Sequence, residues 1–146
     1  MPQANQTVQE QLSRLQFVFT GDSAAMIAAR DRIMDFLHEH NLGEPEEIDV
    51  LVALQEALAN AVVHGCKNDP SQVVRCSVEV DTDAVTIVIT DPGEGFDTKA
   101  NCGAENKPNL TEHGRGLCLI RALMDEVSYS HGGSEVTLKK LRRQIG

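Results

Sequence analysis

The sequence contains no tryptophan and only 3% aromatic residues, so its hydrophobic core must be built mainly from aliphatic side chains. It also has little positive charge, because 13 Lys and Arg stand against 22 Asp and Glu, which gives a formal net charge of −9. A chain this acidic is poorly suited to bind the backbone of DNA or RNA, or an anionic membrane surface. A nucleotide remains a suitable ligand, because backbone N–H groups can build a local phosphate site.

Long apolar runs and a leader segment are missing as well. No uninterrupted apolar stretch approaches the roughly 18 residues that a membrane span needs, and the polar segment 1–11 lacks the apolar stretch of a secretory signal. The four cysteines, Cys66, Cys76, Cys102 and Cys118, form no CxxC pair. We therefore expect a cytoplasmic protein with reduced thiols.

The hydrophobic residues make up 41% of the 146 residues, which is enough for the core of one domain, expected over 12–143. Their spacing separates helices, with a period of 3.6, from strands, with a period of two. The expected elements are strand 15–19, helices 23–40 and 45–64, strands 73–80 and 85–90, helix 117–124, and strands 127–130 and 135–141. Strands paired through tight turns imply a mixed, mainly antiparallel sheet. About three helices would cover one face, giving an α+β fold, a two-layer α/β sandwich.

Three polar residues, Glu56, Asn60 and His64, are spaced four apart in the second expected helix, so they share roughly one face. One interpretation is the solvated stripe of an amphipathic helix. The other is a pocket, because an Asn oxygen suits Mg²⁺ beside phosphates. In that pocket a Glu one turn away could accept a proton from an attacking hydroxyl.

A second group of polar residues, Asp91-Pro92-Gly93-Glu94-Gly95, directly follows an expected buried strand. Asp, Pro and Gly are turn residues, so a turn is one interpretation. In the other, Asp91 places a carboxylate at a pocket floor, where it can select an exocyclic amino group such as that of adenine. Gly93 and Gly95 would let backbone approach the ligand and let the following loop move. The stretch 93–113 has no clear period, and a loop of that length is usually functional or disordered.

The third group, His113-Gly114-Arg115-Gly116-Leu117, precedes or opens the third expected helix. Glycines at a helix start expose N–H groups to an anion, and the helix dipole favours negative charge there. The pattern is neither a Walker A motif nor a Rossmann fingerprint, because no strand leads directly into it and the Lys-Ser/Thr ending is missing.

In this order and spacing, the three groups resemble the conserved boxes of the GHKL ATPase/kinase superfamily, whose domain is histidine kinase-like. Glu56–Gly65 resembles the N box, Asp91–Phe96 the G1 box, and Gly114–Leu117 the G2 box. The variable loop falls where that superfamily keeps its ATP lid. The small size and the Asn60-Ala61-x-x-His64-Gly65 ending are most similar to the anti-sigma factor serine/threonine kinases of bacterial partner switching.

The resemblance implies the Bergerat ATP-binding fold, ATP and Mg²⁺ as cofactors, and a role for each motif residue. Asn60 would hold Mg²⁺, Glu56 would be the general base toward a protein hydroxyl, and Asp91 would bind the adenine amino group. The remaining implied roles are as follows: Gly93 and Gly95 hinge a lid over about 93–113, Gly114, Gly116 and Leu117 lie at the phosphates, Arg115 reaches the γ-phosphate or points to solvent, and His64 supports the helix end behind the site.

The implied function is that of an ATP-dependent serine/threonine kinase and anti-sigma factor. Such a protein sequesters a sigma factor and phosphorylates an anti-anti-sigma antagonist, with no direct nucleic-acid or membrane partner. The family commonly forms dimers, so a homodimer is an expected assembly. A non-catalytic ATP-binding switch and a detached catalytic domain of a histidine kinase remain alternatives. Glu56 favours an enzyme, and the lack of a preceding helical hairpin with a phospho-accepting His disfavours the histidine kinase.

Overall fold

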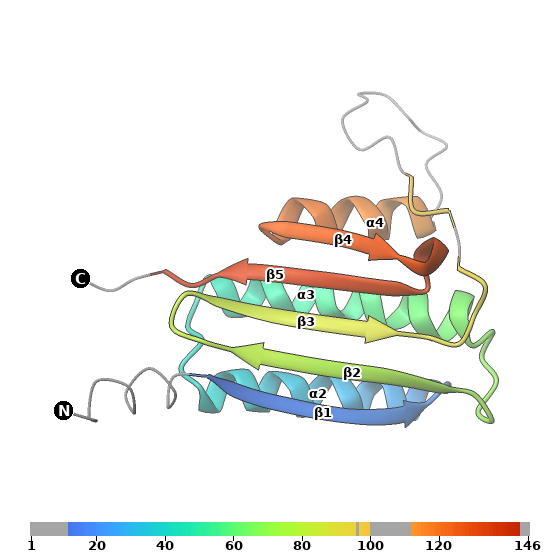
Figure 1. Ribbon diagram of the computed structural model, residues 1–146, viewed down its shortest axis with the longest axis horizontal. Helices are drawn as coiled ribbons and strands as arrows, with labels where there is room; N and C mark the ends of the chain where they lie inside the picture. Colours follow the sequence, from blue (N-terminus) through green and yellow to red (C-terminus); the bar gives the residue numbers. More distant parts are fainter. Residues whose placement is uncertain (1–11, 96, 100–111, 144–146) are drawn as a thin grey trace.

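The computed structural model describes residues 12–95, 97–99 and 112–143, and its elements follow the expected order (Figure 1). The elements are strand β1 (Ser13–Thr20), helices α2 (Ser23–Glu39) and α3 (Glu46–Asn60), the π-helical turn η1 (Ala61–Gly65), strands β2 (Val73–Val80) and β3 (Ala84–Thr90), helix α4 (Glu112–Leu123), strand β4 (Glu126–Ser130), the 3₁₀ turn η2 (His131–Gly133) and strand β5 (Glu135–Leu141).

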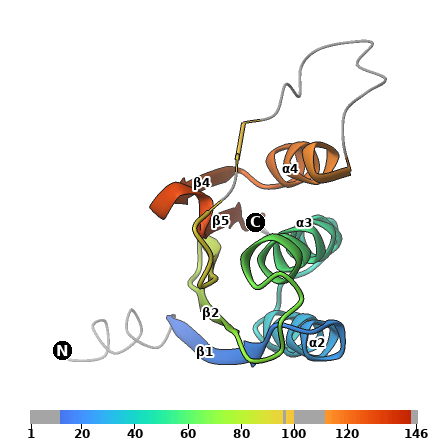
Figure 2. The same ribbon diagram turned by 90° about the vertical axis from the view of Figure 1, so that its right-hand side faces the viewer.

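The five strands form one sheet in the order β1-β2-β3-β5-β4, and all four strand pairs are antiparallel. Helices α2, α3 and α4 lie side by side on the same face of the sheet (Figure 2). The expected two-layer α+β sandwich is therefore confirmed. Tight turns join β2 to β3 and β4 to β5, so these neighbouring strands run antiparallel. The pairs β1–β2 and β3–β5 are antiparallel as well.

The core lies between the sheet and the helix layer, with α3 at its centre and buried residues from α2 and α4 as well. Strand β2 alternates buried and more exposed residues, as the period of two predicts, and its inward side chains are buried. The largest fully buried side chains are aliphatic, which agrees with the scarcity of aromatic residues: Ile33, Leu37, Leu54, Leu58, Ile87, Ile89, Leu117, Ile120, Leu138, Val50, Val62 and Val74.

The continuous helix from Glu46 to Gly65 is long and apolar enough to cross a membrane, judged by length and composition alone. In the structure its apolar residues Val50, Leu54 and Leu58 are fully buried in the domain core. A core helix of a globular domain passes the same composition test, so the arrangement accounts for these residues without a membrane.

The two arginines that follow β5, Arg142 and Arg143, contact other elements of the domain. The Arg142 guanidinium donates to the carbonyl oxygens of His40 at 3.1 Å and Asp81 at 2.7 Å, and Arg143 Nε lies 3.4 Å from Glu46 Oε1. The tail is thus tied to the ends of neighbouring elements within the domain.

Two expectations need correction. Helix α4 begins at Glu112 rather than at the expected Leu117. Gly114 and Gly116 carry no apolar side chain, so the apolar period does not reveal the first turn of this helix. Cys118 is disulfide-bonded, so the expectation of reduced thiols is wrong there, whereas Cys66 is a free thiol. Most of the expected lid, residues 96 and 100–111, lies outside the described residues.

Candidate functional site

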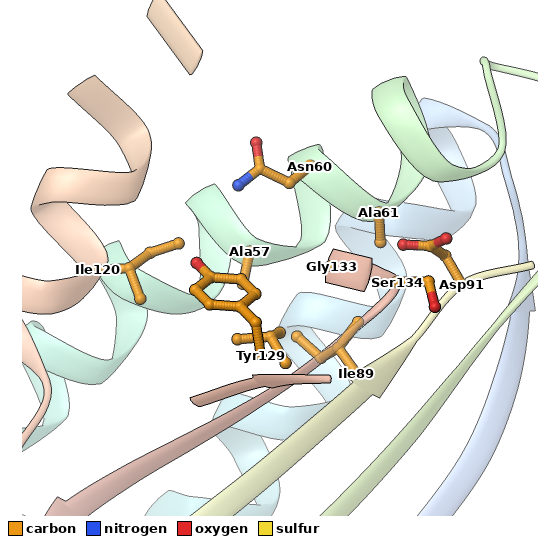
Figure 3. A pocket seen from close by; sticks show the side chains of 10 residues that line it. Ala57, Asn60, Ala61, Ile89, Asp91, Ile120, Tyr129, Gly133 and Ser134 are labelled. Atoms are coloured by element: carbon orange, nitrogen blue, oxygen red, sulfur yellow. The ribbon is translucent and has the colours of Figure 1, made fainter. Parts of the chain in front are cut away.

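The three sequence motifs meet at one end of the sandwich. Helix α3 with η1, strand β3 and helix α4 all place a motif at this end, together with the β4–β5 turn (Figure 1). A pocket, partly open to solvent, lies between these elements. Its lining consists of Ala57, Asn60, Ala61, Ile89, Asp91, Ile120, Tyr129, Gly133, Ser134 and Val136 (Figure 3).

Asp91 forms the acidic part of the pocket and is one of the few buried charged residues among those described. Its backbone N–H donates to the Ser134 carbonyl at 2.9 Å, and its Oδ1 accepts the Gly93 N–H at 2.8 Å. Burial raises the pKa of the Asp91 carboxyl, and the hydrogen bond from Gly93 partly opposes that rise. The pocket therefore presents a fixed, desolvated acceptor for a ligand hydrogen-bond donor.

The end of the N box packs directly on Asp91. A Cβ atom added at Gly65 would lie 2.1 Å from Asp91 Cγ, and one added at Gly93 would lie 2.8 Å from the Gly65 carbonyl oxygen. The π-helical turn leads into this contact, with the Cys66 N–H donating to the Ala61 carbonyl at 2.8 Å. Such turns insert one extra residue into a helix and recur at functional sites. Glycine is therefore required at Gly65 for Asp91 to occupy its position.

Asn60 lines the same pocket as Asp91, and the two side chains come from the two facing layers (Figure 3). In the part of the chain that the structure describes, no group of three His, Cys, Asp or Glu side chains could hold a metal ion. A Mg²⁺ ion beside phosphates does not need such a group, because it keeps several waters and takes one or two protein oxygens. Asn60 is thus suited to be a single protein ligand.

The G2 motif touches the N box through a second glycine. A Cβ atom added at Gly116 would lie 2.5 Å from Glu56 Oε1, so the half-buried carboxylate lies directly against the first turns of α4. Gly114 is also buried, and the side chain of Leu117 is fully buried in the core, so only its backbone can face a ligand. The Arg115 side chain is exposed.

The remaining motif residues lie around this centre. Gly95 has a φ of +91°, and a Cβ atom there would lie 2.0 Å from the Gly132 carbonyl oxygen, so the G1 loop packs closely on the β4–β5 turn. That turn itself is left-handed at His131, Gly132 and Gly133. His64 is exposed in η1 and does not line the pocket.

Sequence reasoning missed one wall of the pocket. Tyr129 of β4 and Ile120 of α4 line it, and the Tyr129 hydroxyl oxygen is buried. Burial raises the pKa of Tyr129, and the Arg121 guanidinium, 5.7 Å from the ring centroid, opposes that rise. Arg121 also donates to the Thr98 carbonyl at 2.8 Å. The alternation of β4 placed Tyr129 on the helix-facing side, but no sequence signal linked it to the distant motifs.

Comparison with known proteins agrees with this geometry. The family model described as "Histidine kinase-like ATPase domain" matches residues 19–140. The chain therefore belongs to the histidine kinase-like ATPase domain family, and the expected resemblance is confirmed.

Two relatives and one solved structure show which members of the family this chain resembles. An anti-sigma F factor of Clostridium beijerinckii is 31% identical over 132 residues, which cover 86% of this chain and 91% of the relative. A serine-protein kinase RsbW of Staphylococcus epidermidis is 40% identical over 101 residues, which cover 63% of this chain and 64% of the relative. A solved structure of the RsbU and RsbW domains of a Mycobacterium tuberculosis protein aligns with a TM-score of 0.59 at 21% identity. It covers 90% of this chain and 33% of that one, and it shows a shared fold.

Proposed function

We propose that this protein is a cytoplasmic, ATP-dependent serine/threonine kinase that is also an anti-sigma factor. In this proposal it sequesters a sigma factor and phosphorylates an anti-anti-sigma antagonist protein. The names of its relatives, an anti-sigma F factor and a serine-protein kinase, support both activities. The homodimer expected from the resemblance stays a prediction.

The lining of the pocket has the chemistry that the adenine end of ATP would need. Asp91 offers a buried carboxylate, which accepts hydrogen bonds only and so favours an exocyclic amino group. Gly65 and Gly93 keep side chains away from that carboxylate. Apolar atoms of Ala57, Ile89 and the other lining residues suit the faces of a planar ring. The chain's own contribution here is to bind and orient the base.

The phosphate end of ATP would lie between Asn60 and the start of α4. The start of a helix presents backbone N–H groups, and the positive end of the helix dipole favours an anion there. Gly114 and Gly116 allow a phosphate to approach that backbone, and the exposed Arg115 is within the same turn. When bound, Mg²⁺ neutralises charge on the phosphate oxygens, and Asn60 is the residue that would hold it.

Glu56 is the proposed general base. Its carboxylate is held against Gly116, so it lies beside the proposed phosphate position rather than at the adenine end. From there it would take the proton of a Ser or Thr hydroxyl on the antagonist as the oxygen attacks the γ-phosphorus, while the bond from that phosphorus to the bridging oxygen breaks and ADP leaves. In this proposal His64, which is exposed at the helix end and does not line the pocket, would support η1 and not contact the ligand.

One observation carries this proposal: the close approaches of Gly65 to Asp91 and of Gly116 to Glu56 join the N box to both other motifs, and Asn60 and Asp91 line one pocket. The test is to incubate the pure protein with Mg²⁺-ATP and candidate antagonist proteins from its gene neighbourhood, with Glu56→Gln as the control. The proposal expects phosphate on one Ser or Thr of the antagonist, located by mass spectrometry, and much less with the control.

The same experiment separates the alternatives. Phosphate on a histidine would indicate a histidine-kinase catalytic domain. Tight ATP binding with no phosphoprotein formed by any antagonist would indicate a non-catalytic switch. Either result would contradict the kinase assignment.

A further inference from the structure

Lys140 of β5 has an environment unlike that of an ordinary surface lysine. Its side chain is 12% exposed, and its ammonium lies 3.0 Å from Asp49 Oδ2. The same ammonium donates to the carbonyl oxygen of Leu123 at 2.5 Å. Lys140 follows Val136 and Leu138 at the strand period of two, so it points to the helix layer and not to the open face of the sheet.

The two partners of Lys140 are the ends of two helices. Leu123 is the last residue of α4, where carbonyl groups lack intrahelical partners and carry the negative end of the helix dipole. Asp49 lies in the first turn of α3. One ammonium therefore fastens the end of α4 to the start of α3 and to the sheet, and its hydrogen bonds to charged or dipolar groups are stronger than neutral ones.

Helices α3 and α4 run in opposite directions side by side (Figure 1), and they make one of the most extensive contacts between elements. Near the pocket they touch where Gly116 packs on Glu56. At their other ends Lys140 joins them. Because a helix of 12 residues is a stiff rod of about 18 Å, fixing its last turn also fixes where its first turn lies.

We propose that Lys140 is a positioning residue for the nucleotide phosphates. By holding the last turn of α4, it keeps the first turn, with Gly114 and Gly116, at the distance from Glu56 that a bound phosphate needs. Ile120 in the core and Arg121 at Thr98 hold the middle of α4, and Lys140 sets its far end. This inference rests on the proposed function, in which α4 begins at the phosphates.

The test compares ligands with and without phosphates. Lys140→Met keeps the length and apolar stem of the side chain and removes the ammonium. Lys139→Met is the matched control, because Lys139 is the neighbouring residue, points to the opposite face, and pairs only with Glu126 at 3.5 Å among the described ion pairs. Lys140→Arg tests rescue by a conserved charge. Each variant is titrated with Mg²⁺-ATP and with adenosine, and its thermal unfolding is recorded.

The inference predicts that Lys140→Met weakens Mg²⁺-ATP binding by about tenfold, within the range for a residue that acts on a site through the position of a helix and does not contact the ligand. Adenosine binding should stay within about twofold of wild type, because Asp91 and the base pocket are not touched. Lys139→Met should bind both ligands as wild type does, and Lys140→Arg should recover most of the ATP affinity. Where Lys140→Met fails to fold, Asp49→Asn, which keeps the bond to Leu123, should show a smaller loss of the same kind.

Two results would overturn the inference. Equal losses of ATP and adenosine affinity in Lys140→Met would show a purely structural role. Unchanged ATP affinity in this variant would show that Lys140 does not position the phosphate site. If wild-type protein binds Mg²⁺-ATP no more tightly than adenosine, the phosphate site of the proposed function is wrong, and the inference fails with it. The wild-type comparison thus separates the two failures.

Discussion

The Cα atom of Gly65 lies so close to the Asp91 side chain that an added Cβ would be 2.1 Å from Cγ and 2.5 Å from Oδ1. This contact joins the end of the N box to the first residue of the G1 motif. It explains why the helix ends in a glycine at this position, because any larger residue would displace the carboxylate from the pocket.

Gly65→Ala should therefore damage both packing and ligand binding. We expect a stability loss of about 1–3 kcal/mol, typical of overpacking in a filled interior, and ATP binding weakened by at least about tenfold as Asp91 moves. Chemical denaturation and calorimetry measure the two effects. Gly43→Ala is the matched control, because nothing lies within 4 Å of an added Cβ there. If Gly65→Ala matched wild type in stability and ATP affinity, the contact with Gly65 would not be what holds Asp91 in position.

Asp91→Asn should weaken ATP binding and still make the fold more stable. Burial raises the pKa of Asp91 in the folded state, so the folded protein binds more protons at this site than the unfolded chain, and the carboxylate costs stability once it ionises. Stability from this group is thus lost as pH rises above the ordinary Asp value of about 3.9 and through the raised pKa.

The neutral amide of Asp91→Asn avoids that cost. Its unfolding temperature should exceed that of wild type at pH 7, and the gain should shrink as the pH is lowered toward 4. Asp35→Asn, at an exposed position on α2, is the control and should show no such trend. An Asp91→Asn protein that is less stable than wild type at neutral pH would show that the carboxylate is stabilising where it lies.

Substitutions of Asn60 and Glu56 should impair different steps, ATP binding for Asn60 and phosphoryl transfer for Glu56. Asn60→Ala removes the proposed Mg²⁺ ligand, so it should abolish Mg²⁺-dependent ATP binding and all transfer. Glu56→Gln should bind ATP nearly as well as wild type and slow phosphoryl transfer by roughly 10²–10⁴-fold, the usual contribution of a positioned base. Gln55→Ala, exposed on the same helix, is the control. Parallel loss of binding and turnover in both variants would contradict the division of roles.

Gly116→Ala tests the second close contact. Its Cβ would meet only the flexible end of Glu56, so the fold should survive while the carboxylate is pushed aside. We expect slower transfer, and less than additive loss when Gly116→Ala is combined with Glu56→Gln, because both act through one group. Steady-state kinetics on the two single variants and the double variant measure this. Fully additive losses would mean that Gly116 acts independently of Glu56.

Much of the fold follows from the sequence. The strict alternation in 73–80 and 135–141 and the helical spacing in 23–40 were sufficient to predict strands and helix, because each element buries one face. The start of α4 was not predicted, because Gly114 and Gly116 give no apolar signal. The π-helical turn at Ala61–Gly65 was not predicted either, because it forms the last turn of the helix, where few residues follow to show a shift in the apolar period.

The site shows the same division. Asn60 and Asp91 were predicted to share a pocket, and the structure brings them together. Tyr129, Ile120 and Lys140 were missed as neighbours of the motifs, because their contacts arise from strand order and helix packing, which local patterns do not encode. The contacts of Lys140 and Arg142 were not predicted for the same reason, since their partners lie far away in the chain.

The central claim, that Asp91 selects adenine in this pocket, is tested most directly by one ratio. Calorimetry should compare the affinities for Mg²⁺-ATP and Mg²⁺-GTP in wild type and in Asp91→Asn. GTP carries a carbonyl oxygen where adenine has its amino group, so a carboxylate should repel it and an amide should accept it. The account predicts a strong preference for ATP in wild type, and a preference weakened by about 1–3 kcal/mol in Asp91→Asn. An unchanged ratio in the variant would contradict it.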